Sequence, residues 1–187
     1  MEKLSILKKK FKEKRISKAQ WIWFGFSHKD TQYIKKIKNI VNKKFKGPKF
    51  DPHLTIIGPF LNLDKIEIER LIKISKKIKK FKIKLEKYKA TKEKFMSLFI
   101  QVKKTKKLLF ERTKLHKIRY LRQKKKYNPH ISLYYGNKNK KEKIKIIKKL
   151  PKLKKFITID KLYIADVNEI INKWKIIKTL KLRNEKN

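Results

Sequence analysis

One short motif occurs twice in the chain, and this repetition constrains the fold more than any other feature. Residues 51–58 read DPHLTIIG and residues 128–136 read NPHISLYYG. Both copies contain proline, histidine, an apolar residue, a hydroxyl residue and a second apolar residue. From the chain's own amino-acid frequencies, a chance copy is expected at about 10⁻⁵ of positions. Two copies therefore indicate two similar structural units.

Each copy predicts a β-strand with one polar and one apolar face. Side chains alternate across a strand, so His53 and Thr55 project to one face. His130 and Ser132 do the same on the second strand. If a pseudo-two-fold axis relates the two units, the polar faces meet. Two imidazoles and two hydroxyls then share one cleft.

The other patterns predict an α+β chain in which the order strand, helix, strand, helix appears twice. Apolar runs and alternation predict strands at 21–26, 53–57, 81–89, 95–102, 130–135, 156–167 and 174–182. Helical spacing of apolar residues predicts helices at 29–45, 64–80, 105–118 and 140–149. No linker rich in serine, glycine or proline separates the two passes. We therefore expect a basic arm at residues 1–18 and one two-lobed domain at residues 19–187.

The charge of the chain has two explanations. With 58 lysine and arginine residues against 15 aspartate and glutamate residues, the formal net charge is +43. Such a surface attracts phosphates, which points to nucleotides or RNA as partners. A compositional bias explains the excess equally well, because only six of the 58 basic residues are arginine and isoleucine is abundant. Charge alone therefore names no function.

Composition excludes several classes of protein. The absence of cysteine excludes disulfides, a thiol nucleophile and thiolate metal sites. No window approaches the roughly 18 to 20 uninterrupted apolar residues of a membrane span, and lysines interrupt the short apolar pairs of the N-terminus. A hydrophobic content of 40% is enough for a folded core. We expect a cytoplasmic, monomeric protein with no membrane partner.

Two histidines at one site can act as a base and an acid near neutral pH, because an unperturbed imidazole titrates near 6.5. The hydroxyls of Thr55 and Ser132 can donate to phosphate oxygens. His28 and His116 lie outside the motifs and are expected to be histidines at the surface or with satisfied hydrogen bonds. A metal site and a Ser132 nucleophile are weaker alternatives, because each histidine is paired with a hydroxyl and Ser132 has no nucleophile-elbow context.

These segments resemble the 2H phosphoesterases, a superfamily defined by two His-x-Thr/Ser motifs on facing strands. The resemblance is specific at residues 47–55 and 127–136 and is greatest to the cyclic phosphodiesterase-like proteins of plants and fungi. It implies a bilobal α+β fold, with two pseudo-symmetric antiparallel-sheet lobes, outer helices and a central cleft. It also implies metal-independent hydrolysis of a small cyclic phosphodiester to a monophosphate, without a cofactor. The implied substrates are a nucleoside 2′,3′-cyclic phosphate and ADP-ribose 1″,2″-cyclic phosphate.

The resemblance assigns roles to five residues. His53 and His130 are the implied catalytic pair, with His130 favoured as base, although the symmetry of the motifs decides nothing here. Thr55 and Ser132 bind the substrate, and so does Tyr135, the aromatic residue three positions after the second hydroxyl.

Two questions stay open for the substrate contacts. Strict alternation would point Tyr134 into the cleft instead of Tyr135, so a bend near Gly136 is required. Trp21, Trp23 and Phe95 are further candidates to line the cleft.

Two other functions remain alternatives. The first is a 2H enzyme that acts on RNA ends, as an RNA 2′,3′-cyclic phosphodiesterase or a 2′-5′ RNA ligase-like protein, with the lysine excess as its RNA-binding surface. The second is a non-enzymatic RNA-binding protein on the same scaffold. Intact copies of both motifs argue against the second alternative.

Overall fold

The computed structural model describes residues 18–119 and 127–184. The basic arm expected at residues 1–18 lies outside this part of the chain except for Lys18, which begins the first strand. The described residues form seven strands: β1 (Lys18–Phe26), β2 (Leu54–Phe60), β3 (Phe81–Ala90), β4 (Leu98–Val102), β5 (His130–Tyr134), β6 (Phe156–Asn168) and β7 (Lys175–Lys181). They also form the helices α2 (His28–Phe45), α3 (Lys65–Lys77), α4 (Lys106–His116) and α5 (Lys140–Ile147), and the short 3₁₀ helices η1 (Lys117–Arg119) and η2 (Ile171–Lys173).

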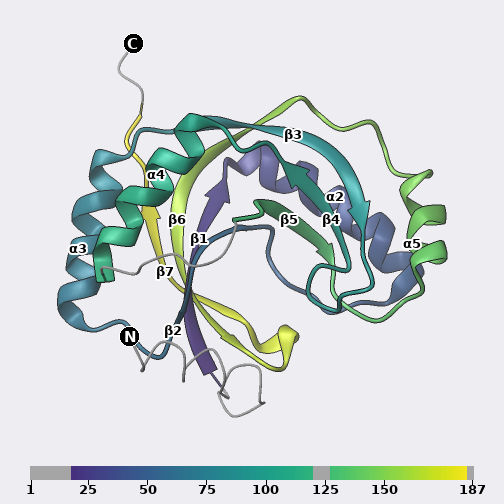
Figure 1. Ribbon diagram of the computed structural model, residues 1–187, viewed down its shortest axis with the longest axis horizontal. Helices are drawn as coiled ribbons and strands as arrows, with labels where there is room; N and C mark the ends of the chain where they lie inside the picture. Colours follow the sequence, from purple (N-terminus) through teal and green to yellow (C-terminus); the bar gives the residue numbers. More distant parts are fainter. Residues whose placement is uncertain (1–17, 120–126, 185–187) are drawn as a thin grey trace.

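All pairings between the strands are antiparallel, in the order β1-β2-β5-β4-β3-β6-β7, with a further pairing between β1 and β6. One lobe consists of β1, β2, β6 and β7, and the other of β3, β4 and β5 (Figure 1). The lobes meet where β2 pairs with β5 and where β3 pairs with the first residues of β6. The predicted α+β fold of antiparallel sheets with outer helices is confirmed.

Local sequence explains where the helices begin. Asp64 accepts a hydrogen bond from the backbone of Glu67, whose side chain accepts one from the backbone of Asp64, and this capping box starts α3. Asn139 and Glu142 form the same arrangement before α5. Helices α3 and α4 lie together on the outside of the first lobe, while α2 packs against β5 and α5 against β3 (Figure 1).

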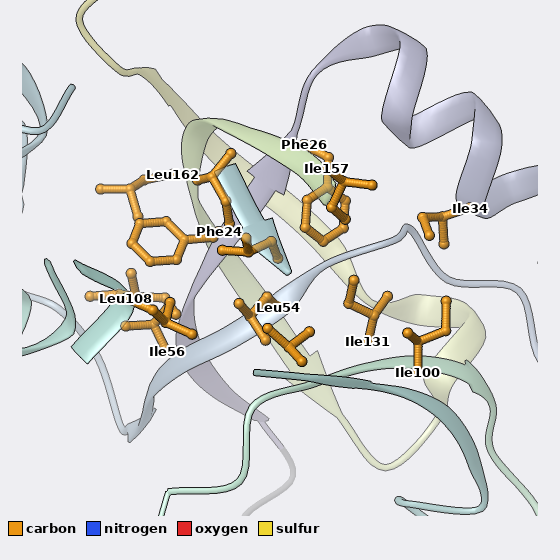
Figure 2. Close-up of a cluster of buried hydrophobic side chains, with 14 of the residues drawn as sticks. Phe24, Phe26, Ile34, Leu54, Ile56, Ile100, Leu108, Ile131, Ile157 and Leu162 are labelled. Atoms are coloured by element: carbon orange, nitrogen blue, oxygen red, sulfur yellow. The ribbon is translucent and has the colours of Figure 1, made fainter. Parts of the chain in front are cut away.

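The core holds the apolar faces of both motif strands. Leu54 and Ile56 of β2 and Ile131 of β5 are buried among side chains that include Phe24 and Leu108 (Figure 2). Burial of these faces leaves His53, Thr55, His130 and Ser132 on the opposite face of the two strands, as alternation predicts. We call this opposite face the motif face.

Element ends differ from the predictions by a few residues. β2 continues past the expected end at Ile57, because Gln20 of β1 pairs with Phe60. The strand expected from Phe95 begins at Leu98, because residues 91–97 form a turn. The backbone N–H of Thr91 donates to the carbonyl oxygen of Ser97 and closes this turn. Both differences arise from contacts with residues that are not neighbours within the element.

Candidate functional site

The register between β2 and β5 brings the two motifs together. Leu54 pairs with Ile131, and the strands are antiparallel. One residue on either side of this pair, His53 lies across from Ser132, and Thr55 lies across from His130. This register sets each motif histidine opposite the hydroxyl residue of the other motif. The four motif residues predicted from the sequence, His53, Thr55, His130 and Ser132, come together on the motif face.

The two imidazoles are oriented by equivalent hydrogen bonds. Nδ1 of His53 lies 2.7 Å from the carbonyl oxygen of Asp51, and Nδ1 of His130 lies 2.8 Å from that of Asn128. A carbonyl accepts only from a ring N–H, so in the neutral imidazole the proton is on Nδ1. Nε2 then carries the free lone pair on both rings. This geometry suits proton transfer by Nε2.

An aromatic side chain supports each imidazole from the neighbouring strand. The Trp23 ring stacks on His53 with centroids 3.7 Å apart and planes 12° apart. The ring centroids of Phe99 and His130 lie 5.1 Å apart, and the two ring planes are inclined by 61°. Trp23 pairs with Thr55 in register, and Phe99 pairs with Ser132, so the two aromatics occupy equivalent places. Trp23 was a candidate to line the site, and the structure brings it against His53.

Further aromatic rings surround His53 on one side. The ring of Phe50 lies 6.1 Å from that of His53 and 4.4 Å from that of Tyr135. The ring of Trp174, which follows η2, lies 6.3 Å from His53 and 5.4 Å from Tyr135. We call Phe50, Tyr135 and Trp174 the aromatic cluster. Nothing in the local sequence around Trp174 pointed to the site, because its approach depends on the connection between β6 and β7.

The two tyrosines after the second motif point to different environments. Burial raises the pKa of Tyr135 to about 12, and the Ser132 side chain opposes this shift. The ring of Tyr134 packs against that of Phe45, with centroids 5.1 Å apart. The Tyr134 side chain also lies over Gly136, whose φ is +147°. A residue with a Cβ would be strained at Gly136. The bend that Tyr135 requires is therefore present.

The other candidates lie farther out. Phe95 is 52% exposed, and its ring is 5.9 Å from that of Tyr135. Trp21 packs against a smaller cluster of side chains on β1 and β6 that contains Trp23, and its ring also faces Gly58. His28 is exposed at the start of α2, and His116 ends α4, so the structure places neither in a motif.

Burial makes the two imidazoles electrostatically unequal. His53 is 4% exposed, and burial lowers its pKa to about 3, with the positive charge of Lys38 acting in the same direction. Burial also lowers the pKa of His130, but the negative charge of Glu93 opposes this shift. His130 is thus the easier of the two to protonate in the free protein.

A buried lysine holds the segment before the first motif. Lys38 of α2 is 4% exposed, and its Nζ donates to the carbonyl oxygen of Phe50 at 2.5 Å. The same Nζ lies 2.9 Å from the centroid of the Phe50 ring. Burial lowers the pKa of Lys38 to about 6. The position of Lys38 on a predicted amphipathic helix gave no reason to select it.

Residues that the structure describes include no group of three or more histidine, aspartate or glutamate side chains arranged to hold a metal ion. No helix in this part of the chain is long and apolar enough to cross a membrane.

The chain is similar to known proteins in sequence and in fold. The model of the 2′-5′ RNA ligase superfamily matches residues 27–169, and no curated protein sequence matches the chain significantly. LigT from E. coli in complex with 3′-AMP superposes with a TM-score of 0.51 at 12% identity, over 89% of this chain and 99% of that one. TT0787 of Thermus thermophilus superposes with a TM-score of 0.55 at 11% identity, over 90% and 100% of the two chains.

A third structure, described as a phosphoesterase, gives a TM-score of 0.57 at 9% identity, over 89% of this chain and 99% of that one. At such identities the structural likenesses show the fold. The family match covers most of the chain and includes both motifs. The chain therefore belongs to the 2′-5′ RNA ligase superfamily of 2H phosphoesterases.

Proposed function

We propose that the protein hydrolyses a small cyclic phosphodiester to a monophosphate without a metal. The substrates that fit are a nucleoside 2′,3′-cyclic phosphate and ADP-ribose 1″,2″-cyclic phosphate. The observation that carries the proposal is the pairing of Leu54 with Ile131, which sets the histidine of each motif opposite the hydroxyl residue of the other. A phosphorus atom between the strands would meet one imidazole on each side and a hydroxyl beside each imidazole.

The reaction requires two proton transfers. One imidazole takes a proton from water as the water oxygen bonds to phosphorus. The bond between phosphorus and the ribose oxygen breaks, and the other imidazole gives that oxygen a proton. The hydroxyls of Thr55 and Ser132 donate to the non-bridging oxygens, where negative charge increases. Solvent then restores the protonation state of both imidazoles, and the proposal assigns no role to a metal.

The unequal imidazoles support His53 as the base and His130 as the acid. A base must be neutral before the reaction, and the buried, Trp23-stacked His53 holds a proton poorly. The acid must be protonated, which Glu93 favours at His130. This assignment is opposite to the one that the family resemblance favours.

The aromatic cluster gives a nucleoside a place to bind. The rings of Phe50 and Trp174 lie beside His53, and both contact the ring of Tyr135. Aromatic rings stack on nucleobases without strong sequence preference, contributing about 1–3 kcal/mol per base. The proposal therefore places the nucleobase against the aromatic cluster and the cyclic phosphate at the motif face.

The test is turnover of a 2′,3′-cyclic mononucleotide by single variants. We expect His53→Ala and His130→Ala each to lower kcat by about 10² to 10⁴, because each removes one proton transfer. Thr55→Ala and Ser132→Ala should each lower kcat by about 10². His28→Ala is the matched control, since His28 is exposed and outside both motifs, and it should keep full activity.

Two results would contradict the proposal. Near-normal turnover by either motif-histidine variant would exclude two-histidine catalysis. Loss of activity in EDTA with recovery in Mn²⁺ or Zn²⁺ would show that a metal carries the chemistry.

A second candidate is action on RNA ends. The family match and the net charge of +43 favour it, because a cationic surface binds a polyanion. Comparison of a cyclic-ended oligoribonucleotide with a cyclic mononucleotide separates the two candidates. A protein that bound RNA but turned over neither substrate would be a non-enzymatic RNA-binding protein.

A further inference from the structure

Few backbone contacts join the two motif strands directly. Among the described residues, β2 and β5 pair at Leu54↔Ile131 alone, whereas β1 pairs with β6 from Lys18 to Phe26. Acid–base catalysis requires the reacting groups to be held within about 0.5 Å of their productive positions. One residue pair by itself fixes the spacing of the two strands only weakly. Contacts between side chains and backbone must therefore contribute to the spacing of the two histidines.

Tyr127 makes such a contact across the two motifs. Its hydroxyl donates to the carbonyl oxygen of Thr55 at 3.0 Å. Tyr127 stands three residues before His130, and Thr55 is the hydroxyl residue of the other motif. Burial raises the pKa of Tyr127, so the phenol keeps the proton that it donates.

The segment between Tyr127 and His130 is held at both of its middle residues. The carbonyl of Asn128 accepts from His130 Nδ1, and the carbonyl of Pro129 accepts from the backbone N–H of Val102 at 3.1 Å. A short segment fixed in this way transmits the position of Tyr127 to His130. The hydrogen bond to Thr55 therefore bears on the spacing between the second imidazole and the first motif.

Arg112 of α4 holds the Tyr127 ring and bonds to the same strand. Its Cζ lies 3.9 Å from the ring centroid of Tyr127, and its Nε donates to the carbonyl oxygen of Ile56 at 3.2 Å. The register between β1 and β2 slips here, since Trp23 pairs with Thr55 but Ile22 pairs with Ile57. This bulge leaves Ile56 without a partner residue on β1. Tyr127 and Arg112 thus bind two successive carbonyls of β2.

The first motif has a similar pair that cannot act across the lobes. Phe50 stands three residues before His53, and Lys38 from the preceding helix lies over its ring. Phenylalanine has no hydroxyl, and Lys38 bonds to the carbonyl of Phe50 itself. An aromatic ring covered by a basic side chain is therefore common to both motifs. The hydrogen bond that crosses to the other motif belongs to Tyr127.

We propose that Tyr127 and Arg112 are positioning residues that set the distance between the two motifs for the proposed reaction. They touch the carbonyls of the motif strand and not the reacting atoms. This inference rests on the proposed function, so its experiment must separate the failure of one from the failure of the other.

The decisive variant is Tyr127→Phe, which removes the hydroxyl and keeps the ring under Arg112. The matched control is Tyr88→Phe, because Tyr88 on β3 donates to the carbonyl oxygen of Pro151 at 2.8 Å, outside both motifs. On a cyclic mononucleotide, Tyr127→Phe should lower kcat at least tenfold and leave KM within twofold. Misplaced histidines stabilise the transition state less but leave substrate binding unchanged. Its Tm should fall no more than that of Tyr88→Phe, whose kcat should equal that of the unaltered protein.

Arg112 provides the second arm of the test. Arg112→Met should lower kcat as Tyr127→Phe does. The fold-decrease in kcat of the double variant should be smaller than the product of the two single decreases, because both residues act through the same contact with β2. Arg112→Lys keeps a cation over the ring and should recover part of the kcat. Multiplicative effects in the double variant would overturn the common role.

The histidine resonances distinguish the possible failures. If the unaltered protein is active and Tyr127→Phe matches Tyr88→Phe in kcat, the positioning role is wrong and the proposed function stands. If the unaltered protein has no activity, the proposed function fails, and NMR titration of His130 decides the positioning role. Tyr127→Phe should then change the His130 titration, Tyr88→Phe should not, and equal titrations in both variants would overturn the inference.

Discussion

His53 and His130 occupy equivalent places in the two motifs and still differ in chemistry. Both donate Nδ1–H to the carbonyl two residues earlier, so their own motifs orient them alike. Their surroundings differ, because Trp23 stacks flat on His53 while Phe99 meets His130 by its edge. Besides burial, Lys38 lowers the pKa of His53, whereas the negative charge of Glu93 raises that of His130. In the proposed reaction, such asymmetry suits one imidazole to the role of base and the other to that of acid.

The first residue-scale prediction concerns acid stability. The pKa of His53 is lowered to about 3 in the folded protein, against 6.5 for an ordinary histidine. Between these values the unfolded chain binds a proton that the folded chain does not, so this group reduces stability as pH falls below 6.5. The free energy of unfolding should therefore fall more steeply from pH 7 to pH 4 than it does in His53→Gln. Urea denaturation measures both slopes, and His28→Gln should behave as the unaltered protein does.

The second residue-scale prediction tests the acid and base assignment. kcat/KM should follow a bell-shaped pH profile whose optimum lies below 6.5, because burial lowers the pKa of both imidazoles. Glu93→Gln removes a negative charge that favours protonated His130. If His130 is the acid, the alkaline limb of the profile moves to lower pH at low ionic strength. Movement of the acidic limb instead would reverse the assignment, and Glu86→Gln on β3 serves as the charge control.

At the scale of elements, one carboxylate joins α2 to β6. Asp30 accepts hydrogen bonds from the backbone N–H of Thr158 and the hydroxyl of Ser27, each at 2.9 Å, and pairs with Lys154 at 3.1 Å. Burial alone would raise the pKa of Asp30, but these interactions outweigh it and lower the pKa. The stability that Asp30 contributes is therefore present at neutral pH and is lost as pH falls through its lowered pKa.

Asp30→Ala should destabilise the protein by about 1–3 kcal/mol at pH 7, because it leaves the buried N–H of Thr158 without its acceptor. The effect should shrink as the pH falls below 3.8, because the unfolded chain then binds a proton at Asp30 more readily than the folded chain does. Urea denaturation at pH 7 and at pH 3 measures this difference. Glu69→Ala on the exposed face of α3 is the control and should change the stability by less than about 0.5 kcal/mol. An equal loss at both pH values would contradict the electrostatic account.

The whole molecule carries a charge whose role depends on the size of the substrate. A net charge of +43 acts on an oligonucleotide through many phosphates but on a cyclic mononucleotide through one. For single strands, log K falls by about 0.7 per tenfold rise in salt for each phosphate contacted. The salt dependence of catalysis therefore reports how many phosphates are bound.

If the lysine excess is compositional, a cyclic-ended oligoribonucleotide should give no higher kcat/KM than a cyclic mononucleotide at physiological salt. Removal of residues 2–17, which precede β1, should leave mononucleotide turnover almost unchanged. Steady-state kinetics from low to high KCl concentration would test both statements. A steep salt dependence with strong oligomer preference, lost on that truncation, would establish the RNA-end enzyme in its place.

The sequence by itself determined the motifs, the strands that carry them and the order of helices and strands. These features are local, because alternation along β2 and β5 and the capping boxes of α3 and α5 depend on residues a few positions apart. Repetition of one motif was enough to predict two lobes and a shared site for His53 and His130. The bend at Gly136 that Tyr135 requires was also expected from the sequence.

Only the tertiary structure decided what surrounds the motifs. The bond from Tyr127 to Thr55 joins residues 72 positions apart, and Trp174 reaches His53 from beyond β6. The depth of burial that lowers the pKa of His53, and the place of Lys38 over Phe50, also depend on how helices pack against another lobe's strands. No local pattern encodes these contacts, because the free energy that selects them comes from burial shared among distant segments.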